Sequence, residues 1–291
     1  MSAAGQRALR SRFRDDPGAR SPVDPIDGEN FPVAMRVLPR DVRDDLTAVY
    51  RFARYVDNVG DESPGDRLRS LEAVAADLHR LYDGGPTDIP EVAGLRVVVD
   101  RREVPIDPWI GLVEANELDQ RRNRYPTFED LLHYCELSAN PVGRVVLHVF
   151  GQATPERIAL SDQVCTALQL IEHWQDLRED YLRDRVYLPQ EDLERFGVPE
   201  EQLGRDVATP ALAALVRFEN DRALAWLDAG ALLVSTLRGW ARVAVSGYVN
   251  GGRAAAWQLR RCGHDPLRGV RKPTAAQIAR TWARSSLRSA G

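Results

Sequence analysis

The stretch "QLIEHWQDLREDYLRDRVYLP" (residues 169–189) contains three acidic residues at intervals of four. On a helix, Glu172, Asp176 and Asp180 share an arc of roughly 80° with Gln169. The apolar residues of the stretch fall on the opposite side: Leu170, Ile171, Trp174, Leu177 and Tyr181. Because carboxylates one turn apart repel each other by a few tenths of a kcal/mol, such a stripe is usually a solvated face. The pattern predicts an amphipathic helix and leaves open whether its acids face solvent or a ligand.

A second acidic stripe occurs in "YRFARYVDNVGDE" (residues 50–62). Here Tyr50, Arg54, Asp57 and Asp61 share one side of the expected helix, and valines and a phenylalanine lie opposite. Aspartates one turn apart supply the hard oxygen ligands that Mg²⁺ accepts together with water and phosphate oxygens. Arginines bind phosphate oxygens in pairs. Two Asp-x-x-x-Asp helices facing each other predict a magnesium–diphosphate site, whereas one such pair alone would be weak evidence.

Helical periodicity extends along the rest of the chain and is interrupted by proline and glycine clusters. "LRVVVD" (95–100) is the only β-like run, and it is short and isolated. The segments predicted to be helical are 41–60, 66–82, 88–101, 108–122, 127–150, 155–182, 190–195, 210–229, 230–249 and 251–262. We therefore predict one all-α bundle.

The composition limits the class of protein. The chain has 291 residues, of which 44% are hydrophobic and 28% are charged, which is ordinary for a soluble globular protein. A net charge of −4 does not favour nucleic acid as a partner. Three widely spaced cysteines form neither a metal motif nor a disulfide framework. No apolar run reaches the roughly 18 residues of a membrane span, so we expect a cytoplasmic location.

Four segments in order resemble the squalene/phytoene synthase family: "ENFPVAMRVLP" (29–39), "YRFARYVDNVGDE" (50–62), "YPTFEDLLHYCELSANPVGRVVL" (125–147) and "QLIEHWQDLREDYLRDRVYLP" (169–189). Within that family, "ENFPVA" and "SANPVG" resemble the hydroxysqualene synthase branch of bacterial hopanoid biosynthesis. The resemblance implies the isoprenoid synthase helical bundle around a central apolar cavity. We expect this domain at residues 26–272, between a mobile N-terminal tail (1–25) and a basic C-terminal tail (273–291).

The resemblance also implies roles for individual residues. Asp57 and Asp61 match the first Mg²⁺ motif, and Asp176 and Asp180 match the second. Family members usually carry asparagine at Glu172, so this acid is either a further metal ligand or a charge that weakens diphosphate binding. The residues that match substrate-binding or cavity positions are Asn30, Arg54, Arg185, Gln169, Tyr50 and Tyr134.

Other family positions are less clear. Asp119 matches a family acid whose role is uncertain. A tyrosine found late in many relatives corresponds to Gly252, one turn after Tyr248.

Structural roles compete with several of these assignments. Tyr50 and Tyr134 are also suitable core aromatics whose hydroxyls reach a partner, and Arg185 suits a helix C-terminus. His133, His148 and His173 have no spacing typical of metal ligands, and we interpret them as structural.

The function implied is Mg²⁺-dependent ionisation of presqualene diphosphate, followed by rearrangement and capture by water to give hydroxysqualene. The implied partners are this isoprenoid diphosphate, a membrane surface contacted peripherally, and other enzymes of the squalene pathway. Two alternatives remain: a head-to-head prenyltransferase that makes presqualene diphosphate, squalene or phytoene, and a non-catalytic scaffold. The chain has no G-x-G-x-x-G nucleotide fingerprint after a strand, which gives no support to a reductive reaction.

Overall fold

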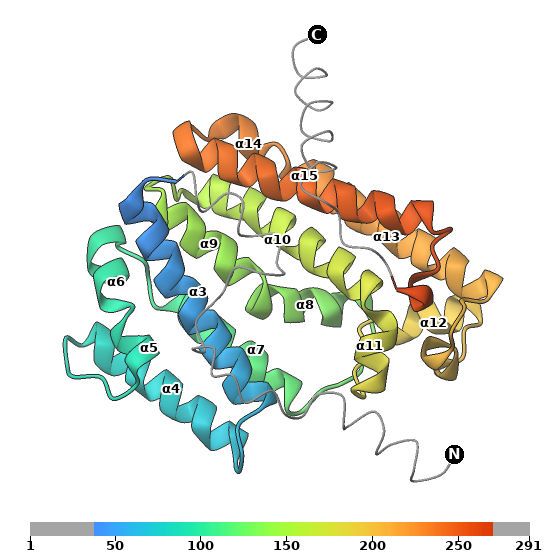
Figure 1. The fold of residues 1–291 in the computed structure, drawn as a ribbon, viewed down its shortest axis with the longest axis horizontal. Coiled ribbons are helices and arrows are strands. Elements are labelled where there is room, and N and C mark those ends of the chain that lie inside the picture. Colours follow the sequence, from blue (N-terminus) through green and yellow to red (C-terminus); the bar gives the residue numbers. More distant parts are fainter. Residues whose placement is uncertain (1–37, 270–291) are drawn as a thin grey trace, which may run out of the picture.

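The computed structural model describes residues 38–269, and within this range the backbone forms helices and no β-strand (Figure 1). The first half contains α3 (Arg40–Asp61), α4 (Arg67–Tyr82), α5 (Pro90–Ala93), α6 (Arg96–Arg102), α7 (Asp107–Asp119), α8 (Phe128–Ser138) and α9 (Asn140–Val149). The second half contains α10 (Pro155–Gln175), α11 (Leu177–Leu182), α12 (Gln190–Phe196), η2 (Glu200–Gly204), α13 (Pro210–Gly230), α14 (Leu233–Thr236), α15 (Gly239–Arg261) and η3 (Pro266–Arg268). The all-α prediction is confirmed. The tail boundaries at 25 and 272 lie outside the described residues and stay predictions.

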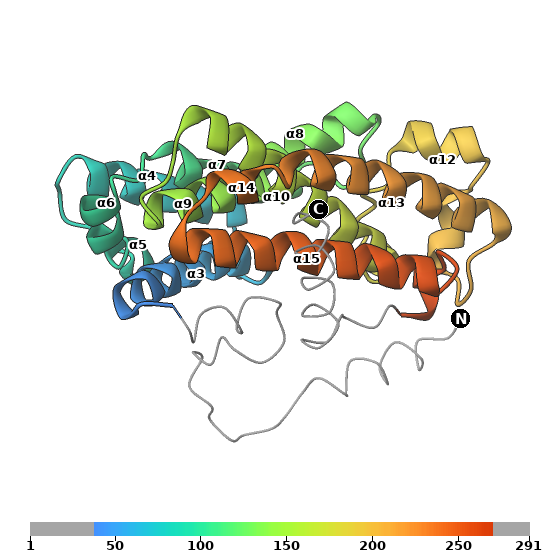
Figure 2. The ribbon, with the colours of Figure 1, turned by 90° about the horizontal axis from the view of Figure 1, so that it is seen from above.

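The helices enclose two hydrophobic clusters. One is built by α3 to α7 with α9, around Phe52 and Trp109. The other is built mainly by α8 and α10 to α15, around Trp174 and Leu227. Phe150 packs against both clusters, which joins them into one body. Seen from above, α3 and α15 run along one face of the molecule (Figure 2).

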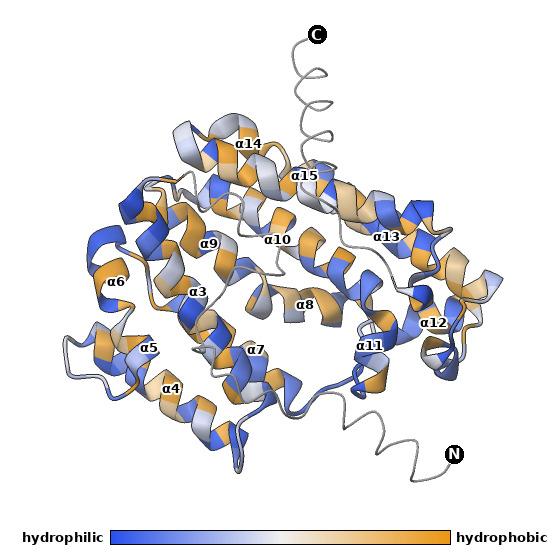
Figure 3. Cartoon of the chain, viewed as in Figure 1, coloured by the Kyte–Doolittle hydropathy of each residue, from blue (hydrophilic) through white to orange (hydrophobic). Residues whose placement is uncertain are grey.

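Two of the long helices, α3 and α15, are amphipathic, as the periodicity predicted. Hydrophobic and hydrophilic residues occupy different sides of these two helices (Figure 3). On α3, the predicted apolar side Val49, Phe52, Val56 and Val59 is buried. Burial of such side chains contributes about 1.5–3 kcal/mol each, and this contribution fixes which side of α3 faces outward.

Helix starts follow side-chain chemistry. Thr127 caps α8: its hydroxyl accepts from the backbone N–H of Asp130 at 3.1 Å, and the Asp130 carboxylate accepts from the N–H of Thr127 at 3.2 Å. This capping box confirms the helix start predicted at Thr127.

Four predicted helical segments differ from the structure in their bounds. The helix predicted at 88–101 is divided into α5 and α6, and the β-like run within it is helical from Arg96 onward, with Val98 buried against the first cluster. A helix end predicted near residue 250 is wrong, since α15 continues through Gly251 and Gly252, and the break falls instead at Leu237–Arg238. The helices predicted at 127–150 and 155–182 are interrupted at Ala139 and Asp176.

Within residues 38–269, no helix is both long and apolar enough to cross a membrane.

Candidate active site

A cavity of about 230 Å³ lies where the C-terminal ends of α3 and α7 meet α8, α10 and the segment after α11. Six residues singled out in the sequence line it: Asp57, Asp61, Asp119, Tyr134, Gln169 and Arg185. They come from positions up to 128 residues apart, because Asp57 lies on α3 and Arg185 follows α11. The fold thus brings the first acidic stripe together with the basic end of the second.

The close approach of α3 and α7 depends on a glycine. Gly60 is buried, and a Cβ built on it would clash with the side chain of Asn116 on α7. Asn116 Nδ2 in turn donates to Asp57 Oδ1 at 3.4 Å and to the Leu112 carbonyl at 3.1 Å. One turn later, Gln120 Nε2 donates to the Gly60 carbonyl at 2.9 Å. These contacts hold the last turn of α3, which carries both aspartates, against α7.

Arg185 connects the two acidic segments. Its Nη2 donates to Asp61 Oδ1 at 2.5 Å, across 124 residues of sequence. Burial acts to lower the pKa of Arg185, but the hydrogen bond to Asp61 and nearby negative groups raise it overall above its ordinary value. Arg185 is therefore a permanent cation at the cavity, with further guanidinium donors available for an anionic ligand.

Asp119 and Tyr134 form a buried pair in the same cavity. The Tyr134 hydroxyl donates to Asp119 Oδ2 at 3.0 Å. Burial raises the pKa of Asp119 to about 6, although Arg185 and the Tyr134 hydrogen bond oppose the shift. Burial also raises the pKa of Tyr134 well above its usual range. At neutral pH this pair is a carboxylate and a neutral phenol.

An aromatic cluster backs the cavity beneath Tyr134. The His173 ring stacks on Tyr187 with centroids 3.7 Å apart, and Tyr187 packs on Tyr134 at 5.5 Å. Gln169 Nε2 lies 3.1 Å from His173 Nε2, and because an amide nitrogen only donates, that ring nitrogen accepts. His173 Nδ1 then faces Asp180 Oδ2, 3.9 Å away. The buried ring therefore links Gln169 in the cavity to the second acidic segment.

The second acidic segment is kinked. Asp176 lies between α10 and α11 with φ −102° and ψ 14°. The bonds from the Asp176 N–H to the Glu172 carbonyl (3.0 Å) and from the Asp180 N–H to the Asp176 carbonyl (2.9 Å) continue through the break. The three acids therefore keep their spacing of one turn. Asp176 and Asp180 are partly exposed, Glu172 is exposed, and none of the three is among the residues lining the cavity.

The remaining predicted residues lie farther from the cavity or outside the described range. Tyr50 is partly exposed and Arg54 exposed on α3, before Asp57, and neither lines the cavity. Asn30 lies outside the described residues. At Gly252, a Cβ would lie 2.5 Å from Leu168 Cδ2 on α10, so a larger side chain at this position requires the Leu168 side chain to shift.

The donor set fits magnesium bound together with a diphosphate. Among residues 38–269, no three His, Cys, Asp or Glu side chains converge into a ready-made metal cage. Mg²⁺ is typically held by one or two carboxylates, with water and substrate phosphates completing its six ligands. Asp57 and Asp61, with the cationic Arg185 beside them, supply that incomplete set at the cavity.

Three neighbouring residues were not identified as candidates from the sequence: Asn116, His173 and Tyr187. Asn116 lies three residues before Asp119, a spacing that places both on one face of α7, so this signal was available. The stack of His173 on Tyr187 had no local signal. The buried His173 ring agrees with a structural role and in addition faces Asp180.

Comparison with known proteins identifies the family. The sequence profile named squalene/phytoene synthase matches residues 27–278, which is most of the chain. The chain belongs to the squalene/phytoene synthase family. It is therefore an isoprenoid synthase by family, and the predicted resemblance is confirmed.

Several family members are similar to this chain. A phytoene synthase from Mycobacterium tuberculosis is 32% identical over 72% of this chain and 70% of the relative. A hydroxysqualene synthase from Rhodopseudomonas palustris is 37% identical over 63% of each chain. The crystal structure of squalene synthase HpnC from Alicyclobacillus acidocaldarius matches with a TM-score of 0.77 and 39% identity, over 82% of this chain and 90% of that one. The implied isoprenoid synthase fold is thereby confirmed.

Proposed function

We propose that this protein is a hydroxysqualene synthase, which ionises presqualene diphosphate and lets water capture the rearranged cation. The observation that carries the proposal is the cavity where Asp57, Asp61 and Arg185 meet the Asp119–Tyr134 pair. One part of the cavity suits a metal-bound diphosphate, and the other part combines apolar and aromatic groups with one carboxylate. Similarity to a hydroxysqualene synthase at 37% identity supports the choice within the family.

The diphosphate would be held by both acidic segments. We assign Asp57, Asp61, Asp176 and Asp180 as the ligands of Mg²⁺, with Glu172 as a further candidate ligand. Bound Mg²⁺ would supply charge neutralisation for the departing diphosphate. Arg185 would donate to phosphate oxygens, and its bond to Asp61 keeps both groups at the cavity beforehand. Arg54 and Asn30 are assigned to the same anion.

The carbocation would rearrange beside Tyr134, Leu112 and Ala115, which line the cavity. An aromatic face such as that of Tyr134 stabilises a passing cation without reacting with it; Tyr50 is assigned a similar role. In the last step a water oxygen bonds to the cation and loses one proton. The Asp119 carboxylate, with its pKa raised to about 6 by burial, is suited to accept that proton. The balance is presqualene diphosphate plus water giving hydroxysqualene, diphosphate and one proton.

A second candidate is a head-to-head prenyltransferase that joins two allylic diphosphates. The phytoene synthase of M. tuberculosis supports it, because that similarity covers more of the chain, 72% against 63%. Both reactions begin with ionisation of a diphosphate, so the same aspartates and Arg185 serve either one. Because the substrates and products are lipids, we also propose peripheral contact with a membrane surface and with other squalene-pathway enzymes.

The test is product identification with purified full-length protein and Mg²⁺. Presqualene, farnesyl and geranylgeranyl diphosphates are each supplied alone, with and without NADPH, and products are identified by mass spectrometry. We expect presqualene diphosphate alone to give hydroxysqualene, without a requirement for NADPH. Consumption of farnesyl or geranylgeranyl diphosphate with presqualene diphosphate untouched would establish the prenyltransferase instead. No diphosphate release from any of the three would support the scaffold alternative.

A further inference from the structure

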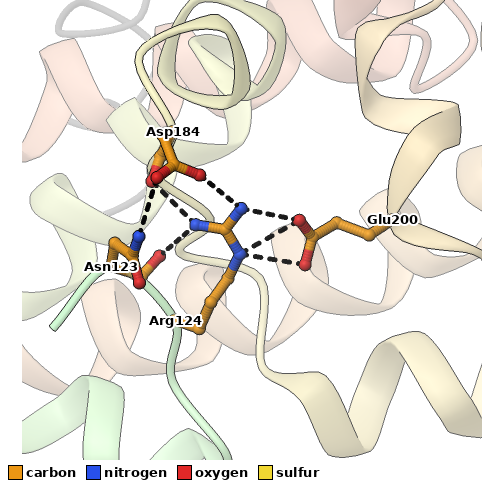
Figure 4. Close-up of polar contacts among 4 residues, drawn as sticks. All are labelled: Asn123, Arg124, Asp184 and Glu200. Atoms are coloured by element: carbon orange, nitrogen blue, oxygen red, sulfur yellow. Dashed lines mark hydrogen bonds and ion pairs between the residues drawn. The ribbon is translucent and has the colours of Figure 1, made fainter.

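Arg124 binds the turn that precedes Arg185. It lies in the segment between α7 and α8, and its guanidinium is enclosed by Asn123, Asp184 and Glu200 (Figure 4). Nη1 donates to the Asp184 carbonyl at 2.7 Å and Nη2 to Asp184 Oδ1 at 2.9 Å. Nε and Nη2 donate to the Glu200 carboxylate at 2.7–3.0 Å, and Nη1 also donates to the Asn123 carbonyl at 3.0 Å. One side chain thus connects three segments.

The turn held by Arg124 has an unusual backbone. Asp184 has φ +63°, in the left-handed region that favours glycine. Its side chain is 77% exposed, so contacts with Arg124 and Asn123, rather than burial, hold it in place. A short parallel bridge joins Arg124 and Val186, in which the Val186 N–H donates to the Asn123 carbonyl at 2.9 Å.

This turn sets the direction of Arg185. The Arg185 N–H donates to the Asp180 carbonyl at 2.9 Å, while its side chain reaches Asp61 in the cavity. Asp184 therefore faces Arg124 on the outer side of the turn, and Arg185 faces the cavity on the inner side. If the turn relaxed to an ordinary backbone conformation, the Arg185 side chain would point away from Asp61 and the cavity, although Arg185 itself is unchanged.

We propose that Arg124 is a positioning residue of the diphosphate site, acting through the Asp184 turn to aim Arg185 at the ligand. This inference rests on the proposed function, because it takes Arg185 as a diphosphate-binding group. The competing explanation is that Arg124 only stabilises the fold, as any partly buried ion pair does.

A double-mutant cycle separates the two explanations. The binding readout is the dissociation constant of inorganic diphosphate in Mg²⁺ buffer, measured by calorimetry on the full chain. The kinetic readout is KM and kcat for the substrate that the enzyme turns over. We expect Arg185→Gln to weaken diphosphate binding about 100-fold and Arg124→Gln about 10-fold, mainly in KM. We expect the double variant to bind no more weakly than Arg185→Gln alone, because Arg124 acts only through Arg185. Effects that multiply to about 1,000-fold would overturn the proposal.

Arg144 provides the matched control. It makes a similar two-bond pair with Asp162, at 2.7 and 3.0 Å, and its side chain is 33% exposed compared with 27% for Arg124. This pair joins α9 to α10 and does not contact the Arg185 turn. We expect Arg144→Gln to leave the dissociation constant within about twofold of wild type, as an ordinary surface ion pair would. A weakening equal to that of Arg124→Gln would show that loss of any such pair is enough, and would overturn the proposal.

Substitutions at Asp184 test the turn without changing Arg124, and they remain informative if Arg124→Gln does not fold. Asp184→Gly retains the carbonyl and accepts positive φ, so we expect binding within about threefold of wild type. Asp184→Val disfavours positive φ, so we expect the roughly 10-fold weakening of Arg124→Gln. Equal diphosphate affinities of Asp184→Gly and Asp184→Val would overturn the proposal. A wild-type protein that binds no diphosphate would refute the proposed function as well, whereas normal binding and turnover in every variant would refute this inference alone.

Discussion

The two Asp-x-x-x-Asp segments have the same spacing but different surroundings. Asp57 and Asp61 occupy one unbroken helix, and both line the cavity. Asp176 lies at the kink between α10 and α11, and Asp180 faces His173, whose ring contacts Gln169 at the cavity. Spacing therefore determines that each pair shares one side of a helix, while neighbouring helices determine what that side faces.

The immediate partners of the two segments differ in charge. Asn116 and the cationic Arg185 contact the α3 pair. The second segment faces the His173 ring, which is fixed between Gln169 and Tyr187. The α3 pair thus lies beside the cationic Arg185 before any ligand is bound, whereas Asp180 faces an aromatic ring, and mutation can test each segment separately.

The largest effect is expected from removing one carboxylate on each side. Asp57→Asn and Asp176→Asn should each lower kcat/KM about 10²–10³-fold, the cost typical of losing one group that stabilises a departing anion. The measurement is steady-state diphosphate release over a range of Mg²⁺ concentrations. Asp221→Asn, which removes an exposed acid of α13 paired with Arg260 of α15, is the control and should be near wild type. Nearly normal activity of Asp176→Asn would mean that only the α3 segment holds the ligand.

Asp119 lines the same cavity as Asp57 and Asp61, and its titration should be visible in the rate. Because burial raises its pKa to about 6, its carboxylate is lost as the pH falls below that value. Wild-type kcat/KM should therefore fall about tenfold per pH unit below pH 6. Asp119→Asn should be about 10²-fold slower at pH 7.5 and should lack this dependence. A wild-type profile that is flat from pH 5 to 7.5 would contradict the role of Asp119.

Stability provides an independent check on the same group. The folded pKa of Asp119 is raised above the ordinary aspartate value of 3.8, so its ionisation favours the unfolded state. The resulting loss of folding free energy begins near pH 4, is complete above about pH 6 and reaches up to about 3 kcal/mol. Asp119→Asn should therefore unfold at higher urea than wild type at pH 7.5 and at nearly the same urea at pH 4.

Glu219 is the matched acid for this check. It is fully buried on α13 beside Arg222, away from the cavity, and burial raises its pKa to about 8. The stability gain of Glu219→Gln should keep rising to about pH 8, because the folded carboxyl stays protonated to that point. Its kcat/KM should remain at the wild-type value. If Glu219→Gln lost as much activity as Asp119→Asn, removal of a buried carboxyl, rather than its position at the cavity, would explain the loss of activity in both variants.

Local pattern predicted the all-α fold and the outward sides of both acidic helices, because periodicity is a short-range property. It placed a helix break near residue 250, inside α15, since glycines that usually end helices allow close packing here: Gly252 lies against Leu168 of α10. It also missed the kink at Asp176, where helical bonds continue across the break. The contacts that orient the site are long-range. Arg124 meets Glu200 across 76 residues and Arg185 meets Asp61 across 124, and no window of sequence contains either pair.

The smallest effect should come from Glu172, at which the family resemblance led us to expect an asparagine. It is exposed on α10, one turn before Asp176. The attraction between the Glu172 carboxylate and a positive charge about 6 Å away, in a medium close to water, would contribute roughly 0.7 kcal/mol to Mg²⁺ binding. Glu172→Gln should therefore raise the Mg²⁺ concentration for half-maximal rate about threefold. Glutamine keeps an oxygen ligand, so the rate at saturating Mg²⁺ should be unchanged.

Glu156→Gln makes the same charge change at the opposite end of α10, where Glu156 lies in the first turn. It should leave the Mg²⁺ requirement unchanged, because charges separated by more than about 10 Å are largely screened at ordinary ionic strength. An equal shift in both variants would assign the effect to overall charge. A lower Mg²⁺ requirement in Glu172→Gln would mean that this acid repels the diphosphate, and the second segment would then resemble the first in having only two metal-binding carboxylates.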